Sequence, residues 1–197
     1  GLANAKFVAY ESTRVTTSPD HASLAAGIEH ARRAIELDGQ LAEAHATLSF
    51  LLVSTGAFDE ARASAHRAVA LEPESWRHQY RLGHAQWGGA RTHALERALA
   101  LYPQFAFAAF ETAMLYVARG DLAAAERIAR RRLEDPGPSA NRFPGVGFHW
   151  MLGALEAEGG RHESAVAAFE KEGSPISLRR LYGPEYAADA AAGRGFS

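Results

Sequence analysis

Hydrophobic and polar positions between Ala42 and Glu74 follow a helical rhythm that breaks once and then stops at Pro73. In the first half, apolar or small residues recur every three or four positions and form one stripe: Ala44, Leu48, Leu51, Leu52 and Thr55. The second half carries a stripe of mostly small residues: Ala61, Ala65, Ala68 and Leu71. We predict two helices joined at Gly56, which can take the left-handed conformation that ends a helix. Such a hairpin has one apolar side that it cannot bury alone.

The same pattern recurs before and after this stretch. The helix predicted over His21 to Asp38 ends in Ala-Ile-Glu-Leu-Asp-Gly, much as the second unit ends in Ala-Val-Ala-Leu-Glu-Pro, and Leu37 lies 34 residues before Leu71. The next stop, Pro103, comes only 30 residues after Pro73. We therefore expect the third hairpin to have a shortened turn or clipped helices.

The first helix of that third hairpin is predicted over Trp76 to Trp87, and the missing residues fall around Gly88-Gly89-Ala90. Two further hairpins follow, with turns at Gly120-Asp121 and at Gly160. Between them, a proline- and glycine-rich stretch from Asp135 to Gly145 predicts a long loop and a candidate insertion. The predicted single domain over 1–197 thus has units at 2–39, 40–74, 75–104, 105–135 and 146–173, with a C-terminal cap or partial unit at 176–193.

This pattern resembles the tetratricopeptide repeat, a helix-turn-helix unit of about 34 residues. The residues that carry the resemblance in the second unit are Leu48, Gly56, Phe58, Ala61, Ala68, Leu71 and Pro73. This copy departs from the family pattern at His45, Ser49 and Ala65. The resemblance covers nearly the whole chain and implies an all-α superhelix, an α-solenoid of about five helix pairs plus a C-terminal helix.

The resemblance also implies where a partner would bind, because the first helix of each repeat lines the concave groove. Carried onto this chain, that face holds Phe50, Val53, Arg77, Tyr80, His84, Trp87, Phe107, Phe110, Met114, Val117 and Trp150. Tyr80, His84 and Trp87 stand at helical spacing on the predicted helix. So many aromatic residues suit an apolar peptide or helix as ligand. Alternatively, the rings pack against each other or against the C-terminal helix.

The composition excludes several classes of function. The net charge of −2 gives no global attraction to nucleic acid or to an anionic membrane. The absence of cysteine excludes disulfides, thiol nucleophiles and thiolate metal sites. No apolar run approaches the roughly 20 residues that cross a bilayer, so we expect no membrane insertion. The expected location is the cytoplasm, or the periplasm if a membrane helix lies upstream.

No catalytic motif stands out in the sequence. His162-Glu163 lacks the second histidine of a zinc-protease helix, and Gly145-Val146-Gly147 follows a loop rather than a strand. The nine histidines do not recur as pairs four residues apart on one face. We therefore predict that the chain is not an enzyme and holds no metal or cofactor.

The first hypothesis for function is a protein-interaction scaffold whose groove binds an apolar or aromatic segment of a partner protein. Alternatives are a sensor or regulatory module and a self-association module that forms a homodimer. Ala9-Tyr10-Glu11 and the phrase that begins at Arg32 resemble, loosely, the repeat regions of bacterial regulators. The chain begins with Gly1 and directly in a helical pattern, so we expect a piece of a longer protein whose effector lies outside it.

Overall fold

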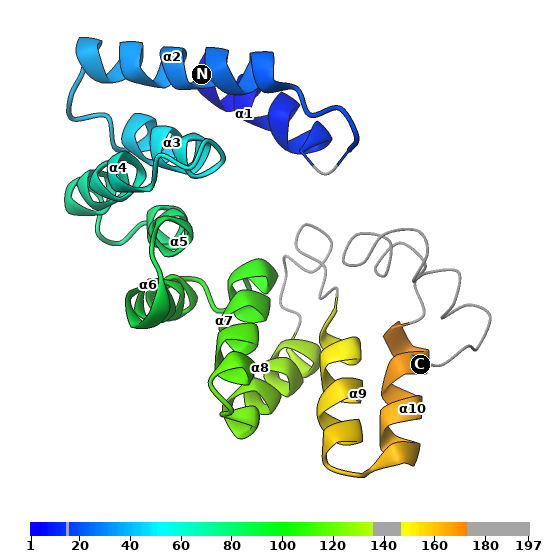
Figure 1. Ribbon diagram of the computed structural model, residues 1–197. Coiled ribbons are helices and arrows are strands. Elements are labelled where there is room, and N and C mark those ends of the chain that lie inside the picture. Colours follow the sequence, from blue (N-terminus) through cyan, green and yellow to red (C-terminus); the bar gives the residue numbers. More distant parts are fainter. Residues whose placement is uncertain (15, 136–146, 173–197) are drawn as a thin grey trace. The chain divides into compact units, whose positions relative to one another are not determined.

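The computed structural model describes residues 1–14, 16–135 and 147–172, and its regular elements there are helices (Figure 1). Contacts divide the chain into two compact units, residues 1–102 and residues 103–197. The all-α fold class is confirmed. The expected loop over 136–145 and the expected cap over 176–193 lie outside the described residues.

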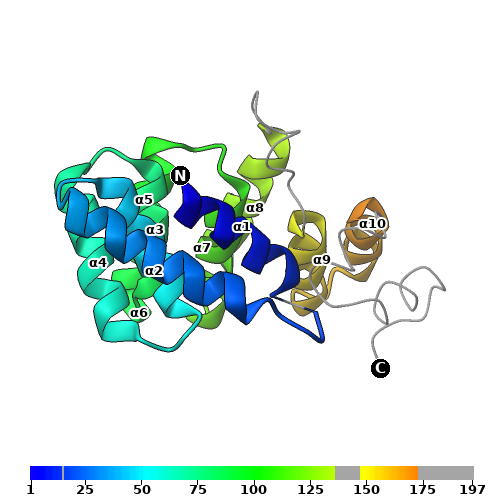
Figure 2. The same cartoon turned by 90° about the horizontal axis from the view of Figure 1, so that it is seen from above.

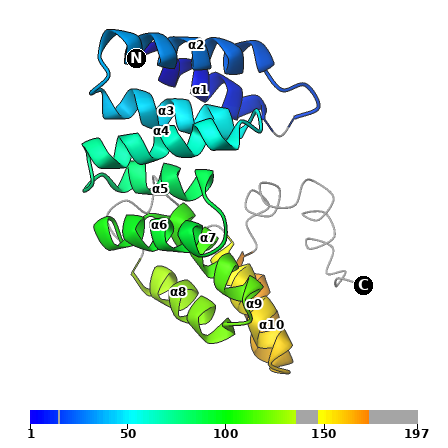
Figure 3. The same ribbon diagram turned by 60° about the vertical axis from the view of Figure 1, so that its left-hand side comes forward.

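Unit 1 (residues 1–102) consists of three helical hairpins. Its helices are α1 (Leu2–Thr13), α2 (His21–Leu37), α3 (Ala42–Val53), α4 (Phe58–Leu71), α5 (Trp76–Ala85) and α6 (Gly88–Leu101). Figure 3 shows the three pairs as successive layers, in which α2 packs on α3 and α4 packs on α5. The first helices also contact one another, because α3 touches both α1 and α5. Residues on one face of α1, α3 and α5 can therefore meet across repeats.

The stripes that the sequence predicts form the core of unit 1. Ala44, Leu48, Leu51 and Leu52 are buried, and so are Ala61, Ala65 and Ala68. Of these, Leu48, Leu51, Leu52, Ala61 and Ala65 belong to one core cluster together with Tyr10, Leu24, Ile28, Ala31, Leu82, Ala85 and Ala94. Placing Thr55 on the stripe was wrong, since α3 ends at Val53 and Thr55 is exposed in the turn.

The turns and helix starts follow the local chemistry of the sequence. Gly56, Gly120 and Gly160 have φ values of 78°, 78° and 73°, the left-handed conformation expected where each first helix ends. At the start of α2, Asp20 accepts a hydrogen bond of 2.9 Å from the backbone N–H of Ser23. This N-cap confirms the predicted helix start.

The third hairpin is shortened, as its spacing predicts. Helix α5 has ten residues where α3 has twelve, and only Gln86 and Trp87 connect α5 to α6. The prediction that the helix continues to Trp87 was wrong. Gln86 and Trp87 both have extended backbone angles, so Trp87 is the N-cap of α6 instead.

Glycine permits close packing within two of the hairpins. A Cβ atom at Gly83 would lie 2.8 Å from Leu95 Cδ2, and one at Gly153 would lie 2.5 Å from Phe169 Cε1. Cβ atoms in proteins essentially never come within 3.0 Å of a non-bonded atom, so a side chain at either position would force its neighbour to shift. Gly83 and Gly153 thus mark points where the second helix of each hairpin approaches the first closely.

Unit 2 (residues 103–197) contains two described hairpins. Its helices are α7 (Ala106–Ala118), α8 (Leu122–Glu134), α9 (Phe148–Glu158) and α10 (His162–Glu172). Helix α8 packs on α9, and α9 and α10 run side by side (Figure 2). Buried Glu156 on α9 binds both Arg130 of α8 and Arg161, the residue before α10.

The N-terminus of α9 is capped from the end of α10. The buried Glu172 carboxylate accepts hydrogen bonds from the backbone N–H groups of Gly147, His149 and Trp150 at 2.8, 3.0 and 3.1 Å. A carboxylate here satisfies donors that have no partner within the helix and complements its dipole. This bond set joins the two ends of the α9–α10 hairpin.

Candidate functional site

Aromatic side chains of the three first helices form a row across unit 1. Phe7 on α1 lies edge-on to Phe50 on α3, with ring centroids 5.0 Å apart. Phe50 in turn lies 4.9 Å from His84 on α5, and His84 lies 4.7 Å from Tyr80. We call these four residues, Phe7, Phe50, Tyr80 and His84, the aromatic row.

Every member of the aromatic row is half-buried, so each ring keeps part of its surface in solvent. Tyr80 and His84 stand four residues apart on α5, which confirms that they share one helix face. The edge-to-face geometry of the Phe7–Phe50, Phe50–His84 and Tyr80–His84 contacts is one that aromatic rings favour. Three repeats therefore present one partly exposed aromatic surface.

A polar row runs beside the aromatic one. Asn4, Thr47 and Arg81 each come three residues before a member of the aromatic row, namely Phe7, Phe50 and His84. We define the polar row as these three residues together with Glu43. Because the offset is the same on α1, α3 and α5, these three polar residues lie about 4.5 Å along their helices before Phe7, Phe50 and His84.

Hydrogen bonds join the polar row across the three repeats. Asn4 Nδ2 and Arg81 Nη1 both donate to Glu43 Oε1 at 3.1 Å. The Thr47 hydroxyl lies 2.8 Å from Asn4 Oδ1 and 3.4 Å from Glu43 Oε1, and Arg81 donates to the Thr47 oxygen at 3.3 Å. The network holds α1, α3 and α5 in register and holds Glu43 in one position.

Glu43 is an ionised carboxylate at neutral pH. Burial by itself raises the pKa of Glu43, but the Arg81 charge and hydrogen bonds from Asn4 and Arg81 outweigh it and lower the pKa below its usual value. The side chain of Glu43 is 42% exposed, against 16% for Arg81. The carboxylate is thus the more accessible charge of the pair.

His78 lies one turn before Arg81 on α5 and is only 2% exposed. Its Nε2 atom lies 3.0 Å from Glu72 Oε2, while Nδ1 has no hydrogen-bond partner among the described residues. Burial lowers the pKa of His78, and the nearby carboxylates of Glu43 and Glu72 offset this only in part. The ring is therefore neutral at pH 7.

Other residues predicted for the groove lie outside the aromatic row. Trp87 is 57% exposed, and its ring lies 5.4 Å from that of Phe58 at the start of α4. Arg77 is exposed and places its guanidinium 4.4 Å from the Trp76 ring centroid. Val53 packs against the buried core of unit 1.

The predicted residues of unit 2 divide into exposed and packed ones. Phe107 is 53% exposed and Met114 is 38% exposed on α7. Phe110 lies edge-on to fully buried Phe148 at 5.7 Å, so it belongs partly to the packing between α7 and α9. Val117 and Trp150 are half-buried. Phe110 thus packs against another ring, as in the alternative interpretation of the groove aromatics given above.

Five residues of the site were not predicted from the sequence: Phe7, Asn4, Glu43, Thr47 and Arg81. A signal for three of the positions was present, since each first helix of unit 1 carries a polar residue three places before an aromatic one. Glu43 carried no such signal, because its role depends on partners 38 and 39 residues away.

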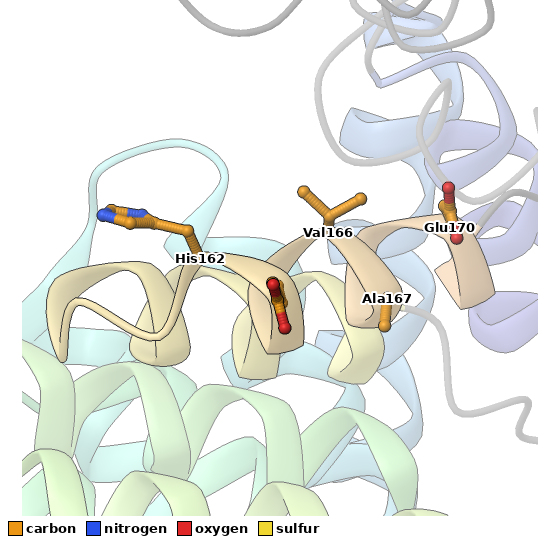
Figure 4. Close-up of a pocket in the computed structure, with 5 residues that line it drawn as sticks. His162, Val166, Ala167 and Glu170 are labelled. Atoms are coloured by element: carbon orange, nitrogen blue, oxygen red, sulfur yellow. The ribbon is translucent and has the colours of Figure 1, made fainter.

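A shallow groove lies along α10 in unit 2 (Figure 4). It is lined by His162, Glu163, Val166, Ala167 and Glu170, all from that helix, and Val166 is 56% exposed. Within the described ranges, no cluster of three metal-ligating side chains is found. The helices described here are also too short or too polar to cross a membrane.

Solved structures with the same fold are found for this chain. No family model and no curated sequence matches the chain. The crystal structure of MamA matches 82% of this chain and 94% of its own, with 21% identity and a TM-score of 0.65. TTC0263, a thermophilic tetratricopeptide-repeat protein of Thermus thermophilus, matches 98% of both chains with 16% identity and a TM-score of 0.62.

YrrB, a tetratricopeptide-repeat protein described as having an unusual peptide-binding site, matches 96% of this chain and 99% of its own. Its identity is 20% and its TM-score is 0.57. The helical hairpins, the left-handed turn glycines and these structural matches lead to one conclusion. The chain has the tetratricopeptide-repeat fold.

Proposed function

We propose that the chain is a protein-interaction scaffold, and that the aromatic row of unit 1 binds an apolar or aromatic segment of a partner protein. The observation that carries this proposal is the contact of Phe7, Phe50, His84 and Tyr80 across three repeats, with each ring still partly exposed. YrrB, which shares the fold, is described as having a peptide-binding site, and this supports a peptide as the kind of ligand.

A partner that covers the aromatic row removes its apolar surface from water, which favours binding. Aromatic rings bury large apolar areas when a partner covers them, and they dominate the energetics of many interfaces. Because the polar row holds the backbones of α1, α3 and α5 in place, the rings are ordered before a partner arrives. A preorganised surface loses less entropy on binding.

The test uses peptides selected from a random display library on the immobilised chain. We expect enrichment of Phe, Trp, Tyr and Leu, and dissociation constants are then measured by fluorescence anisotropy. Phe50→Ala removes the central ring of the row and should weaken binding by about tenfold or more, the size of an interface hot spot. The helical circular dichroism should be unchanged.

Phe58→Ala is the matched control, because Phe58 is a partly exposed aromatic residue that contacts Trp87 rather than the row. It should leave peptide affinity as it is. Equal affinities of wild type and Phe50→Ala, with helicity intact, would contradict the proposal. Loss of helicity in Phe50→Ala would instead identify Phe50 as a core residue.

A second candidate is self-association through α1. Leu2 and Val8 on this helix are 68% and 62% exposed, so a second copy that packs on α1 would cover apolar side chains. Val8→Glu should then shift sedimentation from dimer to monomer. A wild-type chain that is monomeric at high concentration would remove this candidate. The regulatory-module hypothesis and the expected compartment stay predictions.

A further inference from the structure

The two oxygens of Glu43 have different surroundings. Oε1 accepts hydrogen bonds from Asn4 Nδ2 and Arg81 Nη1, both at 3.1 Å, and lies 3.4 Å from the Thr47 hydroxyl. In the part of the chain that the structure describes, no hydrogen bond reaches Oε2. The network therefore fixes the carboxylate through one oxygen and leaves the other as an acceptor.

Charge and exposure favour a cationic donor for that oxygen. Glu43 is 42% exposed, while Arg81 is 16% exposed and already donates to both Glu43 and Thr47. A ligand that approaches the polar row therefore meets the carboxylate more readily than the guanidinium. Lysine and arginine are the side chains that donate charge-assisted hydrogen bonds to a carboxylate.

The distance between the rows limits where such a cation can stand in a ligand. Glu43 Oε1 lies 3.4 Å from the hydroxyl of Thr47, which comes three residues before Phe50, a rise of about 4.5 Å along α3. Successive residues of an extended peptide advance about 3.3 Å. A ligand side chain that packs on Phe50 and a ligand cation that binds Glu43 therefore belong to residues one or two positions apart in the peptide.

We propose that unit 1 recognises a two-part element, an apolar or aromatic anchor on the aromatic row and a lysine or arginine one or two residues away on Glu43. This inference rests on the proposed function and adds a specificity determinant to it. Glu43 selects among segments that the aromatic row alone would accept. Arg81 offsets part of the attraction, so the preference is moderate, of about tenfold.

The experiment compares acetylated and amidated heptapeptides with phenylalanine at the centre. Three peptides differ at a single position, two residues away from the phenylalanine. This position carries lysine, norleucine or glutamate. Norleucine keeps the aliphatic chain of lysine and removes its charge. Dissociation constants are measured for the full chain and for Glu43→Gln, Glu29→Gln and Phe50→Ala.

We expect the wild type to bind the lysine peptide about tenfold more tightly than the norleucine peptide, and less so at high salt. Glu43→Gln should remove this preference, so that the variant binds the lysine and norleucine peptides with equal affinity. Glu29→Gln removes an equal charge from an exposed position on α2 and should keep the preference. Phe50→Ala should weaken the lysine and norleucine peptides alike.

The two proposals fail in different ways. Equal affinities for lysine and norleucine in the wild type, with the dependence on Phe50 intact, would overturn the inference and leave the proposed function standing. A preference for glutamate would overturn it too and would identify Arg81 as the selecting charge. Binding that is independent of Phe50 would overturn the proposed function itself. The wild-type comparison decides the inference even if Glu43→Gln unfolds.

Discussion

His78 shows how one buried side chain links this fold to pH. Burial lowers the pKa of His78 in the folded chain, whereas the unfolded chain takes up its proton near the ordinary value of 6.5. Below pH 6.5 the unfolded state therefore binds more protons, and the free energy of unfolding falls as the pH falls. The loss continues until the pH reaches the folded-state pKa.

We expect this slope to reach at most about 1.4 kcal/mol per pH unit, the limit for one proton. His78→Gln should flatten the unfolding free energy between pH 6.5 and 5, measured by urea denaturation. The same change at the exposed His93 on α6 is the control. An unchanged slope in His78→Gln would show that other groups cause the acid sensitivity.

Glu43 affects stability in a different pH range. Because the pKa of Glu43 is lowered in the folded chain, its contribution to the free energy of unfolding is lost only below about pH 4.5.

At the scale of the element, the close approach of α9 and α10 depends on Gly153. A methyl group there would meet the Phe169 ring at 2.5 Å, so we expect Gly153→Ala to lower the unfolding free energy by about 1 to 3 kcal/mol through overpacking. The sign is informative because alanine favours a helix over glycine by about 1 kcal/mol when nothing else changes.

Gly89 supplies the matched control in α6. A Cβ atom at Gly89 would meet nothing within 4 Å. Gly89→Ala should therefore stabilise the chain by about 0.4 to 1 kcal/mol. Thermal melting followed by circular dichroism checks both variants. A stabilising Gly153→Ala would mean that Phe169 moves away freely and that the hairpin is loosely packed.

The elements themselves follow from local patterns, which explains why much of the fold is predictable. Three- and four-residue spacings give the buried stripes of α3 and α4, and Gly56, Gly120 and Gly160 end helices where the sequence places them. The prediction placed Trp87 inside the helix because an aromatic residue fits the apolar pattern of a helix. Trp87 lies in a turn instead, because this repeat is four residues short. Spacing alone does not show which residue leaves the helix.

At the scale of the whole molecule, the division after Tyr102 separates the three repeats of unit 1 from the two repeats that the structure describes in unit 2. Unit 1 contains a continuous buried cluster that runs from Tyr10 to Ala94, and arrays of about three repeats are the smallest that fold stably. We therefore expect a fragment of residues 1–102 to keep its helicity and to melt cooperatively. A fragment of residues 103–197 should melt at a lower temperature.

Circular dichroism of the two purified fragments checks this prediction. A fragment of residues 1–74, which lacks the third hairpin, serves as the control and should lose much of its stability. An unfolded 1–102 fragment would show that the units depend on each other. The division itself was not predictable from the sequence, because it depends on contacts between repeats, as does the bond network from Asn4 through Glu43 to Arg81.

The short third turn has one further consequence, for spectroscopy. It leaves Trp87 57% exposed against Phe58, whereas Trp76 is stacked on Tyr102. Acrylamide should therefore quench the emission of Trp87 far more than that of Trp76. A ligand on the aromatic row would leave this quenching in place, while a ligand at the hairpin turns would shield it. With Trp76 and Trp150 replaced by phenylalanine, the emission of Trp87 would thus report which edge a partner occupies.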